Sequence, residues 1–201
     1  MNKTCWVDLE TIGLSHNKHQ IIELALLYED GKDENKKVFH KFCKPDIKPD
    51  TWDTPLKGIN KTISELTGIT WEFLEENGIS ERQLYEEAKA FLDKRINAKD
   101  PNDKAIFAAY NAPFDNRFMR ALWEKCGDKY FGSYFESANL DILSTVATAR
   151  KNGVLPSLVN NQQTTVAKHL GIAFKAHSAI EDIKAGRQIN MILEKKMRMR
   201  R

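Results

Sequence analysis

The pattern of hydrophobic and polar residues divides the chain into short apolar strands and amphipathic helices. Residues 5–10, CWVDLE, are typical of a strand in which Asp8 and Glu10, two positions apart, project from the same face. Residues 21–28 and 38–43 form two further short apolar segments, separated by turn-forming residues at 29–35. The chain therefore opens with three strands, which we expect to be antiparallel neighbours.

Helical patterns dominate the rest of the chain. A long connection over residues 45–70 is rich in proline and glycine, and short helices are expected near 61–66. A helix is expected after Ser80, with its apolar residues at 84, 88, 91 and 92 on one face. Residues 105–110 predict a buried central strand. Further helices are expected from Asn111 to Gly127, over 164–170, and from a capping box at Ser178–Glu181 toward the end of the chain.

Two of these predicted helices carry an acid on the apolar face. Asp115 precedes apolar residues by three, four and seven positions, and Asp182 shares a stripe with residues 185, 186, 189 and 193. His177 stands five positions before Asp182. Inward carboxylates need a compensating cation, and a hard divalent metal ion suits carboxylate oxygens. The alternative is that Asp8 and Glu10 are solvated acids on an edge strand and that His177 is structural.

Composition narrows the class of protein only modestly. The 201 residues are 41% hydrophobic and 29% charged, and they carry a net charge of +3, which neither demands nor excludes a polyanionic partner. We expect one domain over residues 1–201, with a basic tail from about 195. Apolar segments are too short to span a bilayer, and the early first strand leaves no room for a signal peptide. Three widely spaced cysteines favour reduced thiols and a cytoplasmic location.

Three short motifs resemble those of the DnaQ-like 3′–5′ exonuclease superfamily, in its DEDDh branch, which includes the proofreading epsilon subunit and the RNase T group. The first motif, Asp-x-Glu-Thr-x-Gly, matches residues 8–13. The second, His-Asn-x-x-Phe-Asp, matches 110–115 with Tyr110 in place of histidine, and the third, His-x-Ala-x-x-Asp, matches 177–182. The tyrosine branch of the superfamily fits less well, because no tyrosine stands four positions before Asp182.

This resemblance implies an RNase H-like α/β fold, with a mixed central sheet of about five strands and helices on both faces. It implies that the catalytic acids bind two Mg²⁺ ions, with Mn²⁺ able to substitute, and that His177 is the general base. The implied metal ligands are Asp8, Glu10, Asp115 and Asp182. The implied contacts to the 3′-terminal nucleotide are Thr11, Gly13, Leu14, Asn111 and Phe114. For Asn111 and Phe114, turn formation and core packing are equally good interpretations.

The activity implied is hydrolytic release of nucleoside monophosphates from the 3′ end of DNA, preferably single-stranded. A 3′–5′ exoribonuclease resembling RNase T or oligoribonuclease, and a non-catalytic nucleic-acid-binding module, remain as alternatives. An endonuclease of the wider RNase H-like group does not account for the motif at 177–182. Single-stranded DNA ends, or RNA, are the expected partners, a DNA polymerase is a candidate partner, and family members occur as monomers and homodimers. Tyr110 is expected to alter local support or a substrate contact rather than catalysis.

Overall fold

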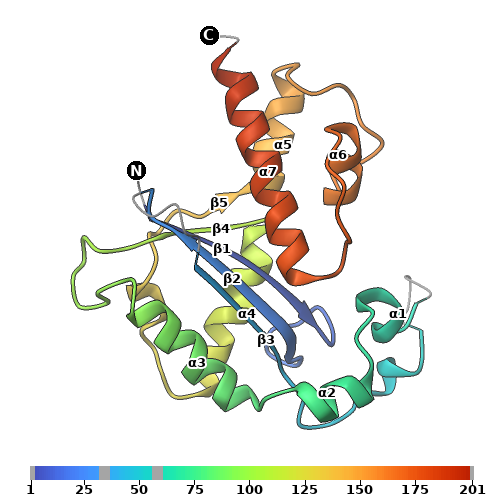
Figure 1. Ribbon diagram of the computed structural model, residues 1–201, viewed down its shortest axis with the longest axis vertical. Coiled ribbons are helices and arrows are strands. Elements are labelled where there is room, and N and C mark those ends of the chain that lie inside the picture. Colours follow the sequence, from blue (N-terminus) through green and yellow to red (C-terminus); the bar gives the residue numbers. More distant parts are fainter. Residues whose placement is uncertain (1–2, 32–36, 56–60, 200–201) are drawn as a thin grey trace.

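A mixed sheet lies at the centre of the protein (Figure 1). The computed structural model describes residues 3–31, 37–55 and 61–199, and within them the sheet has five strands in the order β3-β2-β1-β4-β5. The strands are β1 (Thr4–Thr11), β2 (Ile21–Glu29), β3 (Lys37–Phe42), β4 (Ile106–Ala109) and β5 (Leu140–Asp141). β1, β2 and β3 are antiparallel neighbours, as predicted, whereas β4 and β5 run parallel to β1. Residues 32–35 of the predicted turn at 29–35 lie outside the described residues.

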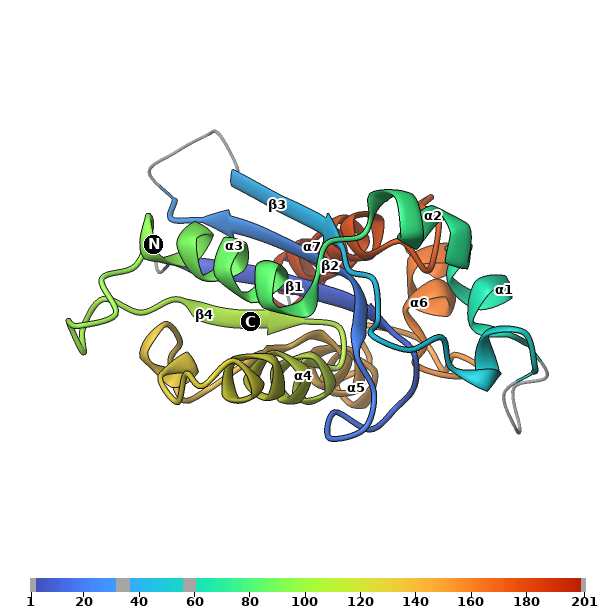
Figure 2. The same ribbon diagram turned by 90° about the horizontal axis from the view of Figure 1, so that it is seen from below.

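Helices cover both faces of this sheet (Figures 1 and 2). One face carries α3 (Glu81–Asp93) and α4 (Ala112–Lys125), and the other carries α5 (Ile142–Lys151), α6 (Gln163–His169) and α7 (Ala179–Arg198). The connection from β3 to α3 contains a 3₁₀ turn (Asp50–Trp52), α1 (Ile63–Thr67) and α2 (Trp71–Asn77), and a second 3₁₀ turn spans Phe131–Ser133. The pattern did not predict α5. No helix within the described residues is long and apolar enough to cross a bilayer.

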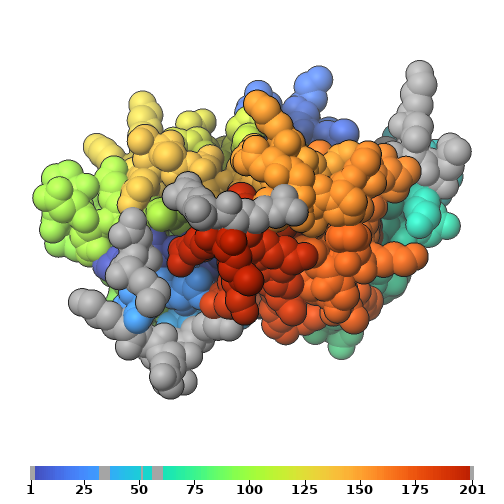
Figure 3. Space-filling view, turned by 90° about the horizontal axis from the view of Figure 1, so that it is seen from above, coloured from blue at the N-terminus to red at the C-terminus, as the bar shows by residue number. Residues whose placement is uncertain are grey.

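Successive side chains of β1 lie on opposite faces of the sheet and pack in two different cores. Cys5, Val7 and Leu9 pack in the core beneath α3 and α4, while Trp6 packs in the core beneath α7. Asp8 and Glu10 follow Trp6 at two-residue steps, so they face the layer of α7, which packs on β1 and β2. In the view from above, α7 (red) lies beside the orange segment that includes α6 (Figure 3).

A smaller third core lies where β1 and β2 meet the long connection. It buries Ile12 and Ile22 at the sheet end together with Trp52, Ile63 and Leu74 from the connection. The rings of Trp52 and Trp71 meet edge to face with centroids 5.3 Å apart. This core holds the connection against the end of β1, where Asp8 and Glu10 lie.

The start of α7 differs from the predicted capping box. The Ser178 side chain makes no cap hydrogen bond. Instead the Ser178 N–H donates to the Asp182 carboxylate at 3.0 Å, and Glu181 pairs with Lys184 on the surface. The capping box is therefore wrong, although the helix it predicted is present. The helix continues through Arg198, so residues 195–198 are helical, and the last two arginines lie outside the described residues.

Candidate metal and active site

Three carboxylates meet at the end of β1. Asp8 and Glu10 come from the strand and Asp182 from the first turn of α7, and one oxygen from each lies within 4.8 Å of the others. The hydrogen bond from the Ser178 N–H fixes the Asp182 side chain. The first and third sequence motifs are thus adjacent in space, although residues 8 and 182 are far apart in the chain.

Asp115 is a fourth acid beside this cluster. It lies in the first turn of α4, as predicted, and is 3% exposed. Its oxygens fall outside the group of three, but its charge acts on that group. Burial, followed by the charge of Asp115, raises the pKa of Asp8 well above its usual value. Burial is also the main reason that the pKa of Asp115 is raised.

The electrostatics of the cluster fit a bound divalent cation. Burial, then the charges of Asp182 and Glu23, raise the pKa of Glu10 to about 8, and burial raises the pKa of Asp182 to about 6. Without a cation to compensate the charge, Glu10 would therefore retain a proton at neutral pH. Oxygen-only donors of this kind suit hard ions such as Mg²⁺ or Mn²⁺. The donor set therefore fits the metal that the motifs implied.

His177 lies on the loop just before α7, beside the acids. Its Nδ1 is 3.9 Å from Glu10 Oε1, and its side chain is 55% exposed. Burial, then the charge of Lys61, lowers the pKa of His177 below its usual value. A neutral imidazole that is open to solvent is able to accept a proton at neutral pH. His177 also has φ of 63°, a left-handed conformation that non-glycine residues seldom adopt.

The turn after β1 is compact and ends in an exposed apolar side chain. Thr11 Oγ1 donates to the Gly13 carbonyl at 2.8 Å, and the Ser15 N–H donates to His19 Nδ1 at 2.9 Å. A Cβ at Gly13 would lie 2.7 Å from the His19 ring, so a side chain there would displace this ring. Leu14 is 79% exposed, which leaves it free to contact a ligand.

The other two predicted substrate contacts lie at the start of α4. Asn111 is exposed and has φ of 71°, which asparagine tolerates better than most residues. Phe114 is partly buried, and its ring lies 4.9 Å from that of Phe118. Phe114 therefore takes part in core packing, while Asn111 forms the turn into the helix.

Sequence reasoning missed two acids that hold the starts of the site helices. Asp141 Oδ1 accepts the N–H groups of Asn111 (3.1 Å) and Ala112 (3.2 Å), and these begin α4. Glu23 Oε1 accepts the N–H of Ala179, the first residue of α7, at 3.2 Å. Each acid interrupts a short apolar segment, and that interruption is the signal in the sequence that could have revealed them.

Tyr110 supports a loop. Its side chain is partly buried against the core beneath α7, and its hydroxyl donates to the Asn161 carbonyl at 2.6 Å. Burial raises the pKa of Tyr110 far above its usual value, so the hydroxyl stays protonated. Tyr110 therefore attaches the segment before α6 to the end of β4, which accords with the supporting role expected for it.

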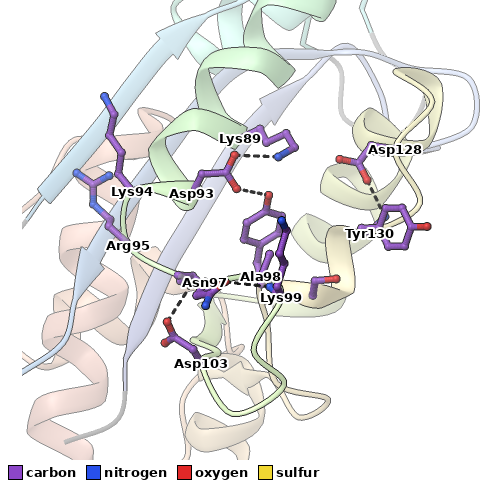
Figure 4. A pocket seen from close by; sticks show the side chains of 13 residues that line it. Lys89, Asp93, Lys94, Arg95, Asn97, Ala98, Lys99, Asp103, Asp128 and Tyr130 are labelled. Atoms are coloured by element: carbon purple, nitrogen blue, oxygen red, sulfur yellow. Dashed lines mark hydrogen bonds and ion pairs between the residues drawn. The ribbon is translucent and has the colours of Figure 1, made fainter.

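A cavity at the end of α3 (Figure 4) has none of the clustered acids in its wall. It measures about 970 Å³ and lies between the end of α3 and the 3₁₀ turn at 131–133. Its wall includes Asp103, which pairs with Lys3 at the opposite end of β1 from Glu10. Asp93 on the same wall already accepts from Lys89 and Tyr134. The cavity is therefore separate from the candidate site.

The sequence of this chain is similar to those of several known proteins. A family model described as Exonuclease, RNase T, matches residues 5–189. A DNA polymerase III of PolC type from Thermotoga petrophila is 30% identical over 185 residues, which cover 91% of this chain and 11% of the polymerase. The PolC-type polymerase of Clostridium perfringens is 30% identical over 193 residues, covering 95% of this chain and 11% of the polymerase. The chain thus spans about a tenth of the length of these relatives.

Solved structures of exonuclease I have the same fold. A product-bound exonuclease I superposes with a TM-score of 0.74 at 16% identity, over 99% of this chain and 45% of the other. The zinc-bound complex of E. coli exonuclease I with single-stranded DNA gives a TM-score of 0.71 at 20% identity, over 100% of this chain and 42% of the other. The predicted RNase H-like α/β architecture is confirmed by these superpositions together with the mixed sheet.

Proposed function

This chain belongs to the exonuclease family, and we propose that it is a metal-dependent 3′–5′ exonuclease that releases nucleoside monophosphates from single-stranded DNA. The observation that carries the proposal is the meeting of Asp8, Glu10 and Asp182, with Asp115 and His177 beside them. Three separate motifs supply these residues. A non-catalytic binding module would have no need to keep four mutually repelling acids and a histidine together.

The four acids would hold two Mg²⁺ ions, and Mn²⁺ would substitute. Bound there, the ions would acidify the attacking water and balance the charge on the departing 3′ oxygen. His177 acts as general base, because its lowered pKa leaves it neutral and its ring is open to solvent. The Ser178 N–H holds Asp182 in position for this work.

We propose that the turn after β1 binds the 3′-terminal nucleotide. Leu14 would contact the base with its exposed apolar side chain. Backbone groups of Thr11 and Gly13 would contact the sugar at the 3′ end. Single strands are gripped by stacking and by backbone charge with little base reading, so we expect low sequence specificity. The complex of E. coli exonuclease I with single-stranded DNA and zinc supports DNA as substrate and a metal as cofactor.

We propose that this activity works together with a DNA polymerase. PolC-type DNA polymerases are among the relatives that match most of this chain, and the match covers about a tenth of each. A 3′–5′ exonuclease that works beside a polymerase removes misincorporated nucleotides. We therefore propose a DNA polymerase as partner, to be sought by co-purification of the tagged chain.

The direct test uses 5′-labelled single strands of DNA and RNA of equal sequence, incubated with the protein and Mg²⁺. Stepwise shortening of the DNA from its 3′ end is the expected result, and EDTA should stop it. Faster shortening of RNA would instead assign an exoribonuclease. Internal cuts, or no cuts with either Mg²⁺ or Mn²⁺, would refute the proposal.

Variants link the activity to the acids. Asp8→Ala should abolish both strand shortening and stabilisation of the fold by Mn²⁺, because it removes a ligand at the centre of the cluster. Glu124→Gln is the matched control, since Glu124 is an exposed acid on α4. Activity that survives in Asp8→Ala, or that disappears equally in the control, would show that the acids are not the site.

A further inference from the structure

Glu23 is a buried acid that the proposed mechanism leaves without a role. It lies on β2 directly opposite Glu10 in the antiparallel register, and it is 2% exposed. Cross-strand partners share a face of the sheet, so Glu23 faces the layer of α7. Glutamates are almost never buried this fully unless they have partners.

The partners of Glu23 lie on two different elements. Its Oε1 is 2.7 Å from His40 Nε2 on β3, and it accepts the N–H of Ala179 at 3.2 Å. Ala179 is the first residue of α7, whose first N–H groups have no partner within the helix. A negative charge at a helix N-terminus is also favourable to the helix dipole. Glu23 thus connects the sheet to the start of α7.

The start of α7 needs such an anchor. His177, two residues before Ala179, has φ of 63°, and unfavourable backbone conformations persist only where surrounding contacts fix them. Asp182 lies one turn into the same helix. A shift at the start of α7 would therefore move two members of the proposed site at once. Asp141 holds the start of α4 in the same way through Asn111 and Ala112.

We propose that Glu23, oriented by His40, is a positioning residue that anchors the start of α7 and so sets Asp182 and His177 against the acids of β1. Glu23 acts through the backbone of Ala179 and does not touch the reacting atoms. The inference rests on the proposed function for its effect on turnover, whereas the anchoring itself is independent of that function.

Kinetics separate positioning from general stability. A misplacement of about 1 Å at a catalytic group costs on the order of 100-fold in rate, so Glu23→Ala should lower kcat roughly 10- to 100-fold with KM little changed. Glu23→Gln keeps an oxygen that accepts from Ala179 and should retain most of the wild-type kcat. His40→Ala, at a position that is 30% exposed, should give an intermediate loss. Lys41→Ala is the control, because Lys41 points to the opposite face and pairs with Glu87 on α3.

Amide exchange tests the anchor directly, without metal or substrate. Using the ¹⁵N-labelled full chain, Ala179 N–H exchange should accelerate in Glu23→Ala and His40→Ala and stay near wild type in Glu23→Gln and Lys41→Ala. If Glu23→Ala fails to fold, His40→Ala carries the test. Unchanged Ala179 exchange in His40→Ala, or equal kcat losses in Glu23→Ala and Glu23→Gln, would overturn the proposal. A wild-type chain without nuclease activity contradicts the proposed function, and Ala179 exchange then decides the anchor alone.

Discussion

Replacing Glu10 with Gln should stabilise the metal-free protein at neutral pH while removing its activity. The Glu10 side chain is 17% exposed and lies within 4.8 Å of carboxylate oxygens of Asp8 and Asp182. Burial, followed by the charges of Asp182 and Glu23, raises the pKa of Glu10 from 4.5 to about 8. Glutamine has nearly the same shape but no charge, so it removes the repulsion without leaving a cavity.

The size of the effect follows from the pKa difference. Between pH 4.5 and about 8 the folded protein holds a proton that the unfolded chain has lost, so wild-type stability falls as pH rises through this window. At neutral pH the penalty is roughly 3 kcal/mol, at about 1.4 kcal/mol per pKa unit. The other acids of the cluster titrate with Glu10 and share this penalty. We therefore expect Glu10→Gln to gain about 1–3 kcal/mol at neutral pH and almost nothing near pH 4.5.

Thermal unfolding in EDTA, followed by circular dichroism, measures this gain. A chain of this size gains about 2–4 °C in Tm per kcal/mol, so the variant should unfold about 2–12 °C above wild type at neutral pH. Glu124→Gln, on the exposed side of α4, should leave Tm unchanged. Mn²⁺ should then raise the Tm of wild type more than that of Glu10→Gln, since the variant has lost a ligand. A Tm gap that is absent, or equal at acid and neutral pH, would refute the electrostatic reasoning.

Three further substitutions test separate parts of the site. His177→Ala should lower kcat about 100- to 10,000-fold while Mn²⁺ still stabilises the fold, because a general base is lost and the acids remain; turnover near wild type would remove His177 from the mechanism. Tyr110→Phe loses the hydrogen bond to Asn161 and should cost about 1 kcal/mol in chemical denaturation with kcat preserved, and an unchanged midpoint would contradict the supporting role. Gly13→Ala places a methyl group against the His19 ring and should raise KM for single-stranded DNA more than it lowers kcat. An unchanged KM would mean that the turn after β1 does not seat the substrate.

Local patterns predicted most of the fold because each element has a simple period or a clear boundary. The apolar segment of β2 and the stripe that contains Asp115 both depend on interactions within a few residues, and both appear as expected. α5 escaped prediction because Asp141 opens it directly from β5, without a loop to separate helix from strand. The pattern also predicted that the first three strands are antiparallel neighbours, whereas the mixed sheet of about five strands came from the resemblance to a known fold.

The sequence predicted which residues gather at the end of β1 better than it predicted how they are held. Asp8, Glu10 and Asp182 were identified by motif, and the structure brings them together. The acids Glu23 and Asp141 were missed, because their role depends on backbone N–H groups from distant elements. A pattern along the chain contains no information on which N–H group lacks a partner in space. The metal-binding roles themselves stay predictions until an ion is titrated.

The order of the site residues along the chain has a consequence during synthesis. β1 emerges first with Asp8 and Glu10, and Asp115 follows with α4, but Asp182 arrives only with α7, the last helix of the described residues. A nascent chain that has folded through α6 contains the whole sheet and three of the four acids, yet it lacks His177 and Asp182. If the proposed function holds, such a nascent chain would have no cutting activity. Docking of α7 onto β1 and β2 then brings the last two residues of the proposed site into place.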